Sequence, residues 1–358
     1  RNNNWGYFEN GVWNMVFAGV NVDTIPTGGW PYEPYTKEET VPKIQEKPYL
    51  VYDEDNGYGV MVPEKRTECQ GISWENGVKG TFYSLNMFYV ADAQKDNADT
   101  INKALKEGKN LLLTPGIYTL DKPITVEEKD TIIYGMGLAT LVSTNGNACM
   151  VTSDADGIKV CGVLFEAGDK QSETLLKVGN EKAEVSHSDN PICFSDVYFR
   201  VGGANYKGKV KNCVTINSND VIGDNFWVWR ADHGDNVGWD MNTAPNGIVI
   251  NGDNVTMYGL FVEHFQEYQT IWNGNGGKLY FYQSEMPYDA PNQKYYMSHN
   301  GKVKGYASFK IGDEVNDFYG CGLGIYCYNR DANIEIFSGA EIPNKDGVEI
   351  RNIVTVKL

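Results

Sequence analysis

Two apolar and aromatic runs of the sequence end in a glutamate and superpose without a gap. Residues 258–263 read YGLFVE, residues 280–285 read YFYQSE, and the two glutamates lie 22 residues apart. About 22 residues make one turn of a right-handed parallel β-helix, in which each strand stacks on the strand one turn before it. The spacing therefore predicts an all-β chain wound as a right-handed parallel β-helix, with Glu263 and Glu285 at equivalent positions of adjacent turns.

The same motif recurs at other spacings. Residues 219–228 and 253–262 match in outline and lie 34 residues apart. Similar runs occur at 130–135, 157–165 and 192–199. The Asn and Gly of this unit suit tight corners, and its apolar residues suit the interior. The uneven spacing predicts loops of different length on one side, where binding clefts usually form. A Greek-key sandwich also alternates strands and turns, but it rarely repeats one motif, so the β-helix is favoured.

A short helix is expected before the first turns. Asn97 can cap a helix whose apolar positions include Ile101 and Leu105, and a strand, turn and strand follow at 111–120. Such a helix covers the open end of a parallel β-helix and blunts its exposed edge. We therefore expect a β-helix domain over residues 91–358. Residues 1–90, with a Pro- and Gly-rich stretch at 26–34, read as the end of a preceding β-helix domain plus a connector.

Charge and cysteine usage exclude several classes of function. The net charge of −16 argues against nucleic acid or an anionic membrane as partner, because both need a positive surface. No stretch approaches 18 consecutive apolar residues, so we expect no segment that spans a membrane. The seven cysteines and four histidines lack metal-site spacing, so we expect neither a metal nor another cofactor. A bridge between Cys321 and Cys327 is left open. The start at Arg1, without a methionine or a signal peptide, predicts a processed or truncated piece in which any export signal has been removed or was never included.

Glu263 and Glu285 are the residues that most invite a chemical reading. At a strand spacing of about 4.8 Å, two carboxylates repel by roughly 3 kcal/mol at an effective dielectric near 20. One of them should therefore hold its proton near neutrality, as the general acid of a glycosidase must. A separation near 5 Å fits a retaining glycosidase, or equally an acid with a second carboxylate that tunes or reprotonates it. The spacing does not decide between these two.

Five stretches carry a resemblance to a known family: 112–118 (LLTPGIY), 137–141 (GLATL), 228–234 (VWRADHG), 259–265 (GLFVEHF) and 281–293 (FYQSEMPYDAPNQ). They resemble bacterial glycoside hydrolase family 55, which contains β-1,3-glucanases related to laminarinases. The resemblance implies two tandem pectate-lyase-like β-helices with a substrate cleft between them. It also implies a secreted bacterial enzyme that cleaves β-1,3-glucan in exo-acting, inverting fashion.

The resemblance implies roles for individual residues as well. Glu285 would be the general acid, Glu263 and Asp232 would form a supporting acidic network, and Tyr288 would help to place the attacking water. Trp229 would contact sugar, and further substrate contacts are expected from His233, Trp239, Gln283 and Trp272. No residue matches a general base. The water side of the cleft is expected from an N-terminal β-helix half, on the same precursor or on a separate chain.

Two other functions remain in view. A β-helix that keeps the cleft without turnover would bind carbohydrate only. A polysaccharide lyase shares the fold, but it would need a basic residue beside a Ca²⁺-binding acidic cluster. Lys and Arg are sparse near the acids, with Arg230 the main exception, so the lyase is the least favoured of the three.

Overall fold

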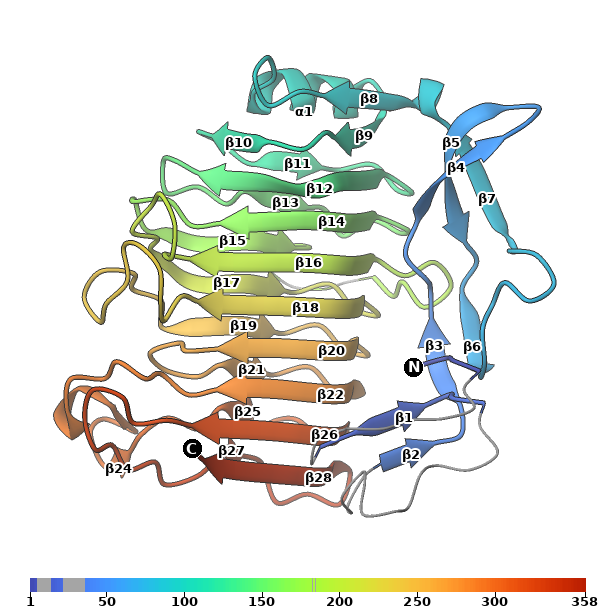
Figure 1. The fold of residues 1–358 in the computed structure, drawn as a ribbon. Helices are drawn as coiled ribbons and strands as arrows, with labels where there is room; N and C mark the ends of the chain where they lie inside the picture. The colour runs from blue at the N-terminus through green and yellow to red at the C-terminus, as the bar shows by residue number, and fades with distance from the viewer. Residues whose placement is uncertain (5–13, 22–35, 182, 184) are drawn as a thin grey trace.

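The computed structural model describes residues 1–4, 14–21, 36–181, 183 and 185–358. Two long parallel sheets dominate these residues and run side by side along one axis (Figure 1). The first sheet is built from β8 (Phe88–Ala91), β9 (Asn110–Leu113), β10 (Ile117–Leu120), β12 (Ile132–Ser143), β14 (Lys159–Glu166), β16 (Cys193–Val201), β18 (Ile222–Arg230), β20 (Thr256–Glu263), β22 (Gly277–Glu285), β26 (Phe318–Cys327) and β28 (Val348–Lys357). The second is built from β11 (Ile124–Val126), β13 (Met150–Thr152), β15 (Ser172–Val178), β17 (Val210–Ile216), β19 (Asn246–Ile250), β21 (Thr270–Trp272), β25 (Phe309–Ile311) and β27 (Ala340–Glu341).

The chain alternates between these sheets and advances one strand at each pass, which is the topology of a parallel β-helix. The predicted fold class is therefore confirmed. The register follows the sequence repeats: Ile222 pairs with Thr256 across the 34-residue repeat, and Glu263 pairs with Glu285 across the 22-residue repeat. Most surplus residues of the longer turns lie in loops that follow the strands of the first sheet, as between β18 and β19, but the long connection from β15 to β16 lies on the other side of the stack (Figure 1).

A bend recurs at one position of successive strands in the first sheet. The residue skipped by the register has positive φ in each, as at Gly162, Asp196, Asn225 and Gly259. Small or short polar residues adopt this left-handed conformation at low cost, which explains why Gly, Asp and Asn occupy the corner. In β22 the same corner is Phe281, with φ 68°, an uncommon conformation for an aromatic residue.

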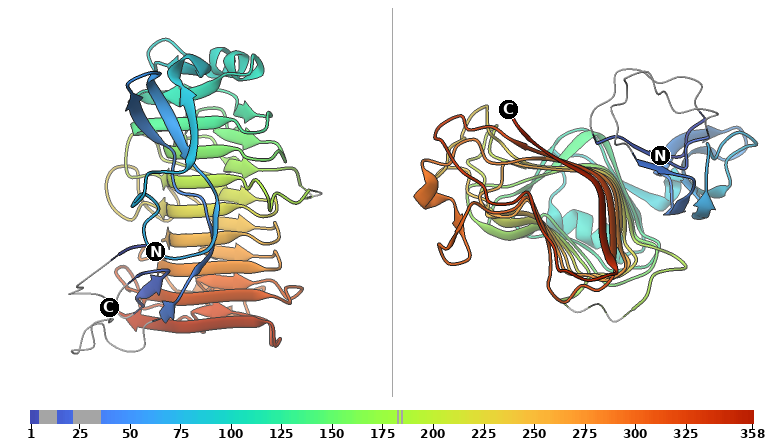
Figure 2. Two further views of the ribbon diagram at one scale, coloured as in Figure 1. Left: turned by 90° about the vertical axis from the view of Figure 1, so that its right-hand side faces the viewer. Right: turned by 90° about the horizontal axis from the view of Figure 1, so that it is seen from below.

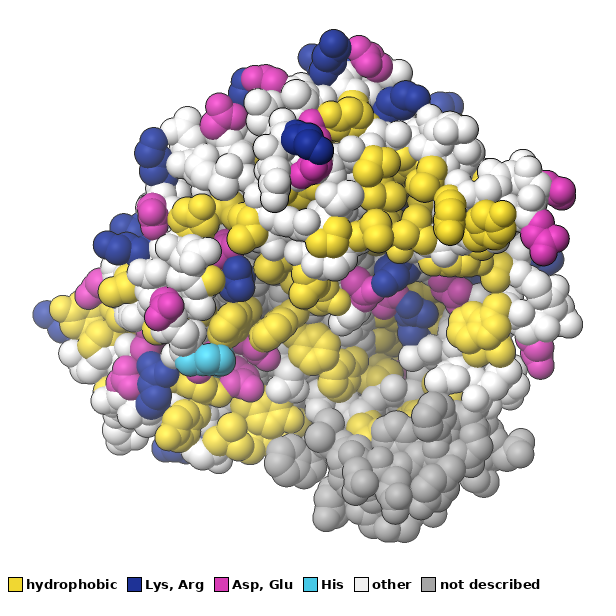
Figure 3. Space-filling model, turned by 45° about the horizontal axis from the view of Figure 1, so that its top comes forward, with side chains coloured by type: hydrophobic (Ala, Val, Ile, Leu, Met, Phe, Trp, Pro, Cys, Tyr) yellow, Lys and Arg dark blue, Asp and Glu magenta, His cyan; other side chains and the backbone are white. Residues whose placement is uncertain are grey.

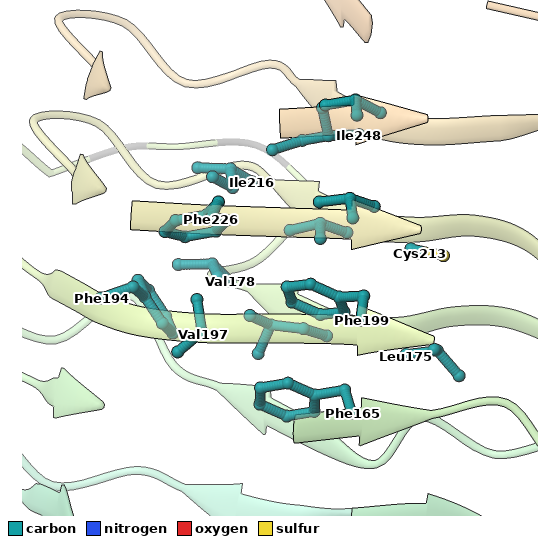
Figure 4. Packing of buried hydrophobic residues seen from close by; sticks show 14 of the residues in the cluster. Phe165, Leu175, Val178, Phe194, Val197, Phe199, Cys213, Ile216, Phe226 and Ile248 are labelled. Atoms are coloured by element: carbon teal, nitrogen blue, oxygen red, sulfur yellow. The ribbon is translucent and has the colours of Figure 1, made fainter. Parts of the chain in front are cut away.

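The interior between the two sheets is filled by stacked apolar side chains (Figure 4). Phe165 and Phe199 stack with ring centroids 4.9 Å apart, and Phe226 continues the column at 6.2 Å from Phe199. Polar ladders complement this core at a corner of the helix. Asn217, Asn251 and Asn273 are linked by two side-chain hydrogen bonds of 2.8 Å each. Stacked identical contacts of this kind hold adjacent turns in register.

Helix α1 (Ala98–Lys106) covers the end of the stack formed by β8, β9 and β11. Asn97 caps it: the Asn97 side chain accepts hydrogen bonds from the Asp99 and Thr100 amides, and Thr100 Oγ1 accepts one from the Asn97 amide. Ile101 and Leu105 are buried against the first turns of the β-helix. The capping helix predicted from the sequence is confirmed.

Residues 36–69, which we call the strap, run along the outside of the β-helix (Figures 1 and 2). The strap rises from the last turns to the first turns over residues 36–60 and then returns, so that Arg66–Cys69 pairs antiparallel with Val41–Ile44. The strap and its neighbours contain β1 (Val16–Ala18), β2 (Thr36–Glu38), β3 (Val41–Ile44), β4 (Tyr49–Asp53), β5 (Gly57–Pro63), β6 (Arg66–Cys69) and β7 (Gly80–Ser84). Its contacts climb the stack in order: Thr36 with Asn352, Glu38 with Tyr319, Lys43 with the Asn254 carbonyl, Lys47 with Asp196, and Val60 with Ile132.

The division into a preceding domain (1–90) and a β-helix domain (91–358) stays a prediction. The first strand of the β-helix, β8, begins at Phe88, close to the expected boundary. The Pro- and Gly-rich stretch at 26–34 lies within residues 22–35, outside the described part of the chain.

Cys321 and Cys327 both lie in β26, six positions apart along one extended strand, and both are free thiols. A bridge between them is therefore ruled out, because disulfide geometry needs Cα atoms within about 7 Å. Among the described residues, no helix is long and apolar enough to cross a membrane. The same residues contain no group of three metal-ligating side chains.

Candidate active site

The candidate site lies on the outer face of the first sheet, where β18, β20 and β22 end and long loops begin. Beyond the recurring bend, side chains alternate between interior and exterior. In β22, Tyr282 and Ser284 are buried, while Gln283 and Glu285 are partly exposed. Because β20 and β22 share this register, the outward positions of neighbouring strands stand in rows along the helix axis.

Glu263 and Glu285 are directly paired across β20 and β22. Trp227 donates its indole N–H to Glu263 Oε2 at 2.8 Å, and the Tyr288 hydroxyl donates to Glu285 Oε2. Burial raises the pKa of Glu263 to about 7, against the Trp227 hydrogen bond, and the negative charges of Glu285 and Asp232 add to the rise. Burial and the neighbouring Glu285 raise the pKa of the Tyr288 hydroxyl above its usual value. Glu263 therefore carries a proton up to about neutral pH, as the pairing predicted for one of the two.

Asp232 and His264 extend the acidic pair into a small network. His264 Nε2 lies 3.6 Å from Asp232 Oδ1 and 3.7 Å from Glu285 Oε2, so the imidazole stands between the two carboxylates. His264 Nδ1 lies 3.2 Å from the Met286 carbonyl oxygen, and its ring packs edge-on against Tyr288 at 4.4 Å. Since a carbonyl only accepts, Nδ1 carries the hydrogen of that bond. Nε2 is then the nitrogen that faces both acids.

His233 and Arg330 complete the surroundings of Asp232. His233 Nδ1 lies 2.8 Å from Asp232 Oδ1, and Arg330 donates to the Asp232 carbonyl oxygen at 2.9 Å. Burial opposes ionisation of Asp232, but His264 and His233 outweigh it and hold the pKa of Asp232 below its usual value. Asp232 is therefore ionised at neutral pH.

Arg230 is not available to the site as a base. Its side chain is fully buried and donates to both oxygens of Asp289 at 2.9 and 2.7 Å. It also donates to the carbonyl oxygens of Asn242 and His264. This buried pair ties the end of β18 to the loop after β22, and so fixes Asp232, two residues beyond Arg230, relative to Glu285.

Trp229, Trp239 and Trp272, which were expected to contact substrate, lie in different environments, and Trp227 lies beside Trp229. Trp227 is 43% exposed and stacks on Trp229 at 5.4 Å, and Trp229 also meets the His233 ring at 5.2 Å. Trp239 is half-buried beneath these loops, with the Arg230 guanidinium 5.7 Å from its ring. The prediction that Trp272 contacts substrate is wrong. Trp272 is fully buried in the core against Phe309 and Phe318, because its strand belongs to the second sheet.

The structure thus brings together Glu285, Glu263, Asp232, Tyr288, His233 and Trp229, and it places Gln283 in the outward row next to them. Sequence reasoning missed Trp227 as the partner of Glu263, although Trp227 and Trp229 are two positions apart and the alternation of a strand places them on one face. It also missed His264, which directly follows Glu263. His264, directly after β20, has a positive φ of 68°, and its imidazole points back toward Asp232 and Glu285. No sequence pattern predicts that backbone conformation.

The fold and the site define a parallel β-helix protein with a cluster of carboxylates on its outer face. Residues 88–285 match the family described as the LAM55 pectate lyase-like domain. The chain is 45% identical, over 360 residues, to an exo-β-1,3-glucanase of Streptomyces sp. (strain SirexAA-E / ActE), and the match covers all of this chain. The chain therefore belongs to the LAM55 family, and its resemblance to glycoside hydrolase family 55 is confirmed.

Solved structures agree. The structure of sacteLam55A from Streptomyces sp. SirexAA-E matches with a TM-score of 0.91 and 45% identity, over 96% of this chain and 62% of that one. A variant of sacteLam55A with one glutamate replaced by alanine, in complex with glucose, matches with the same TM-score at 43% identity, over 98% of this chain and 62% of that one. The chain spans 58% of the length of the curated relative.

Proposed function

We propose that the protein carrying this chain hydrolyses β-1,3-glucan from a chain end with inversion, and that Glu285 is the general acid. The observation that carries the proposal is the pairing of a partly exposed Glu285 with a more enclosed Glu263 that keeps a proton to about pH 7. The Glu285 side chain is 27% exposed, so it can reach a glycosidic oxygen, whereas Glu263 is held back by Trp227.

The relatives support the substrate. The curated relative is named an exo-β-1,3-glucanase, and the second solved structure pairs a glutamate-to-alanine variant with glucose. The glucose bound to that variant fits a site that acts on a glucan and is built on paired glutamates.

In the proposed mechanism Glu285 protonates the departing glycosidic oxygen while a water attacks the anomeric carbon from the opposite face. The lost proton is replaced from Glu263 or through His264, which stands between Glu285 and Asp232. Ionised Asp232 stabilises positive charge that develops on His264 and on the sugar ring. Tyr288, whose hydroxyl donates to Glu285, orients the acid, and it would help to place the attacking water.

No described residue qualifies as the general base, and the chain spans little more than half of its relative. We therefore propose that an N-terminal β-helix half supplies the water side of the cleft, and that the protein acts outside the cell. Laminarin hydrolysis should require both halves. Full activity of residues 1–358 alone would contradict this division.

The acid assignment is tested by comparing wild type with Glu285→Gln on laminarin, using the protein with both halves. Glutamine keeps the shape but cannot give a proton, so we expect kcat to fall by at least about 10²-fold. Glucose as the sole early product would support exo action, and an α-anomer detected first by NMR would support inversion. Full activity of Glu285→Gln would remove the assignment, and a β-anomer would replace inversion with retention.

The binding-only alternative predicts that wild type retains laminarin without releasing glucose. The lyase alternative predicts an unsaturated product with ultraviolet absorbance. Its candidate basic residue, Arg230, is fully buried and paired with Asp289, which counts against it.

A further inference from the structure

Two rows of outward side chains continue from the acid pair toward the earlier turns of the β-helix. Glu285 and Glu263 are followed in register by Trp229 on β18, Arg200 on β16 and Glu166 on β14. The parallel row beside it runs through Gln283, Phe261, Trp227, Tyr198 and Leu164. Each strand adds about 4.8 Å, so Tyr198 and Arg200 lie three strands, or about 14 Å, from Glu285.

The second row is an aromatic track. Phe261, Trp227 and Tyr198 are consecutive in it, and all three side chains are at least partly exposed on the outer face. Trp227 is the most exposed, at 43%. Aromatic faces stack on the apolar faces of sugars, and a track with one ring per strand offers repeated contacts to a polymer lying along the axis. Apolar side chains next to acidic ones, with a histidine beside the acids, are visible on the molecular surface (Figure 3).

The first row adds a donor at the same level. Arg200 Nη2 donates to Glu166 Oε2 at 2.9 Å, and the Arg200 side chain is 28% exposed. A guanidinium has five N–H donors, so one ion pair leaves donors for ligand hydroxyls. Glu166 Oε1 and Arg200 Nε are buried without a hydrogen-bond partner among the described residues. Glu166, 2% exposed, thus holds Arg200 in place without saturating it.

In the opposite direction the track is closed. The next outward position after Gln283 is Gly324 on β26, and a Cβ there would lie about 3 Å from the Asn14 side chain, which covers it. Asn14 is anchored by donating to the carbonyl oxygens of Tyr282 and Gly322. Beyond Glu285 in the first row, Tyr326 is buried, and the Tyr288 and Tyr328 rings meet edge-on at 5.2 Å. Within the part of the chain that the structure describes, the open direction for a polymer at Glu285 is therefore toward the earlier turns.

We propose that Tyr198 and Arg200, with Trp227 between them and the acids, form a distal binding site for the part of the glucan that remains after cleavage. The proposal rests on the proposed function and adds to it a chain-length preference: the site contacts only substrates long enough to extend across three strands. A disaccharide cleaved at Glu285 does not reach it, whereas a hexasaccharide does.

The test compares Tyr198→Ala, Tyr198→Phe and Arg200→Ala with wild type on laminaribiose and laminarihexaose, in the protein with both halves. Losing one stacking contact should raise KM for laminarihexaose by about 3- to 10-fold, with kcat and the laminaribiose constants unchanged. Tyr198→Phe keeps the ring and should behave as wild type. Tyr52→Ala, which removes an exposed aromatic from the strap at 61% exposure, is the matched control and should change nothing.

Each outcome is decisive. Equal losses on both substrates would assign Tyr198 to the acid site or to stability, and no loss on either would show that the track is not a glucan site. Weakened association of the two halves, at unchanged KM in the assembled protein, would make these residues an interface instead. If wild type cleaves neither substrate, the proposed function fails first and the distal site falls with it.

Discussion

At the scale of single residues, the burial of Glu263 gives the protein a carboxyl group that titrates near neutrality. The unfolded chain would lose this proton near pH 4.5, whereas the folded protein keeps it to about pH 7. Folding therefore favours the protonated form, and stability present below pH 4.5 is lost as the pH rises toward 7.

The change Glu263→Gln should remove this loss, because a neutral amide can still accept the Trp227 hydrogen bond without being desolvated as a charge. We expect the free energy of unfolding to rise by about 1–3 kcal/mol at pH 8 and to change little at pH 4. Urea denaturation at both pH values measures the difference. Glu173→Gln, an exposed residue paired with Lys211, is the control. A stabilisation that is the same at both pH values would contradict the raised pKa.

The same residue scale shows what the sequence could and could not predict about the site. Repeat alignment placed Glu263 and Glu285 side by side, because a parallel register carries equivalent positions onto each other. Alternation put Trp227 and Trp229 on one face but could not say which face was interior. The prediction for Trp272 was wrong for the same reason, because the sequence does not show which side of a strand faces the interior. Its short strand, β21, belongs to the second sheet, and the ring lies in the core.

At the scale of elements, α1 is a predicted feature whose stability can be measured separately. Asn97→Ala removes the acceptor of two amide hydrogen bonds of 3.0 and 3.1 Å. We expect a loss of about 1 kcal/mol in the free energy of unfolding. Asn97→Asp should keep most of the stability, and Lys103→Ala, on the exposed face, should have little effect. A loss no larger than that of Lys103→Ala would show that the end of the stack does not depend on this cap.

Most strands of the β-helix were also predictable, because apolar runs and corner residues repeat along the sequence. In the strap, the apolar runs at 49–52 and 58–62 also predict strands, and the structure has β4 and β5 there, but the antiparallel pairing of the strap strands was not predictable. β3 pairs with β6, and β5 pairs with β4 and β7, yet their apolar sides are completed by residues far along the chain. Contacts of that range leave no periodic signal in a short segment.

At the scale of the whole molecule, the strap joins distant turns into one unit. Val41 and Ile44 are fully buried against Tyr258 and Tyr280, which belong to the two strands that carry Glu263 and Glu285. Ile44→Ala should lower the free energy of unfolding by about 2–4 kcal/mol in a single transition. Tyr52→Ala in the exposed hairpin serves as control. Two separate transitions in the denaturation curve would show that strap and β-helix unfold independently.

The climbing order of the strap contacts sets a length for the stack. Parallel β-helices can grow by duplicating a turn, and each new turn would lengthen this one by about 4.8 Å. Thr36 accepts a hydrogen bond from Asn352 of β28, and Val60 lies in one apolar cluster with Ile132 of β12. The segment between Thr36 and Val60 therefore spans a fixed number of turns. Insertions within a turn only enlarge a side loop and are tolerated. A whole added turn would move the two attachment points of the strap apart by one strand spacing, and the strap contacts between them would no longer match. This chain can therefore vary its loops more readily than its number of turns.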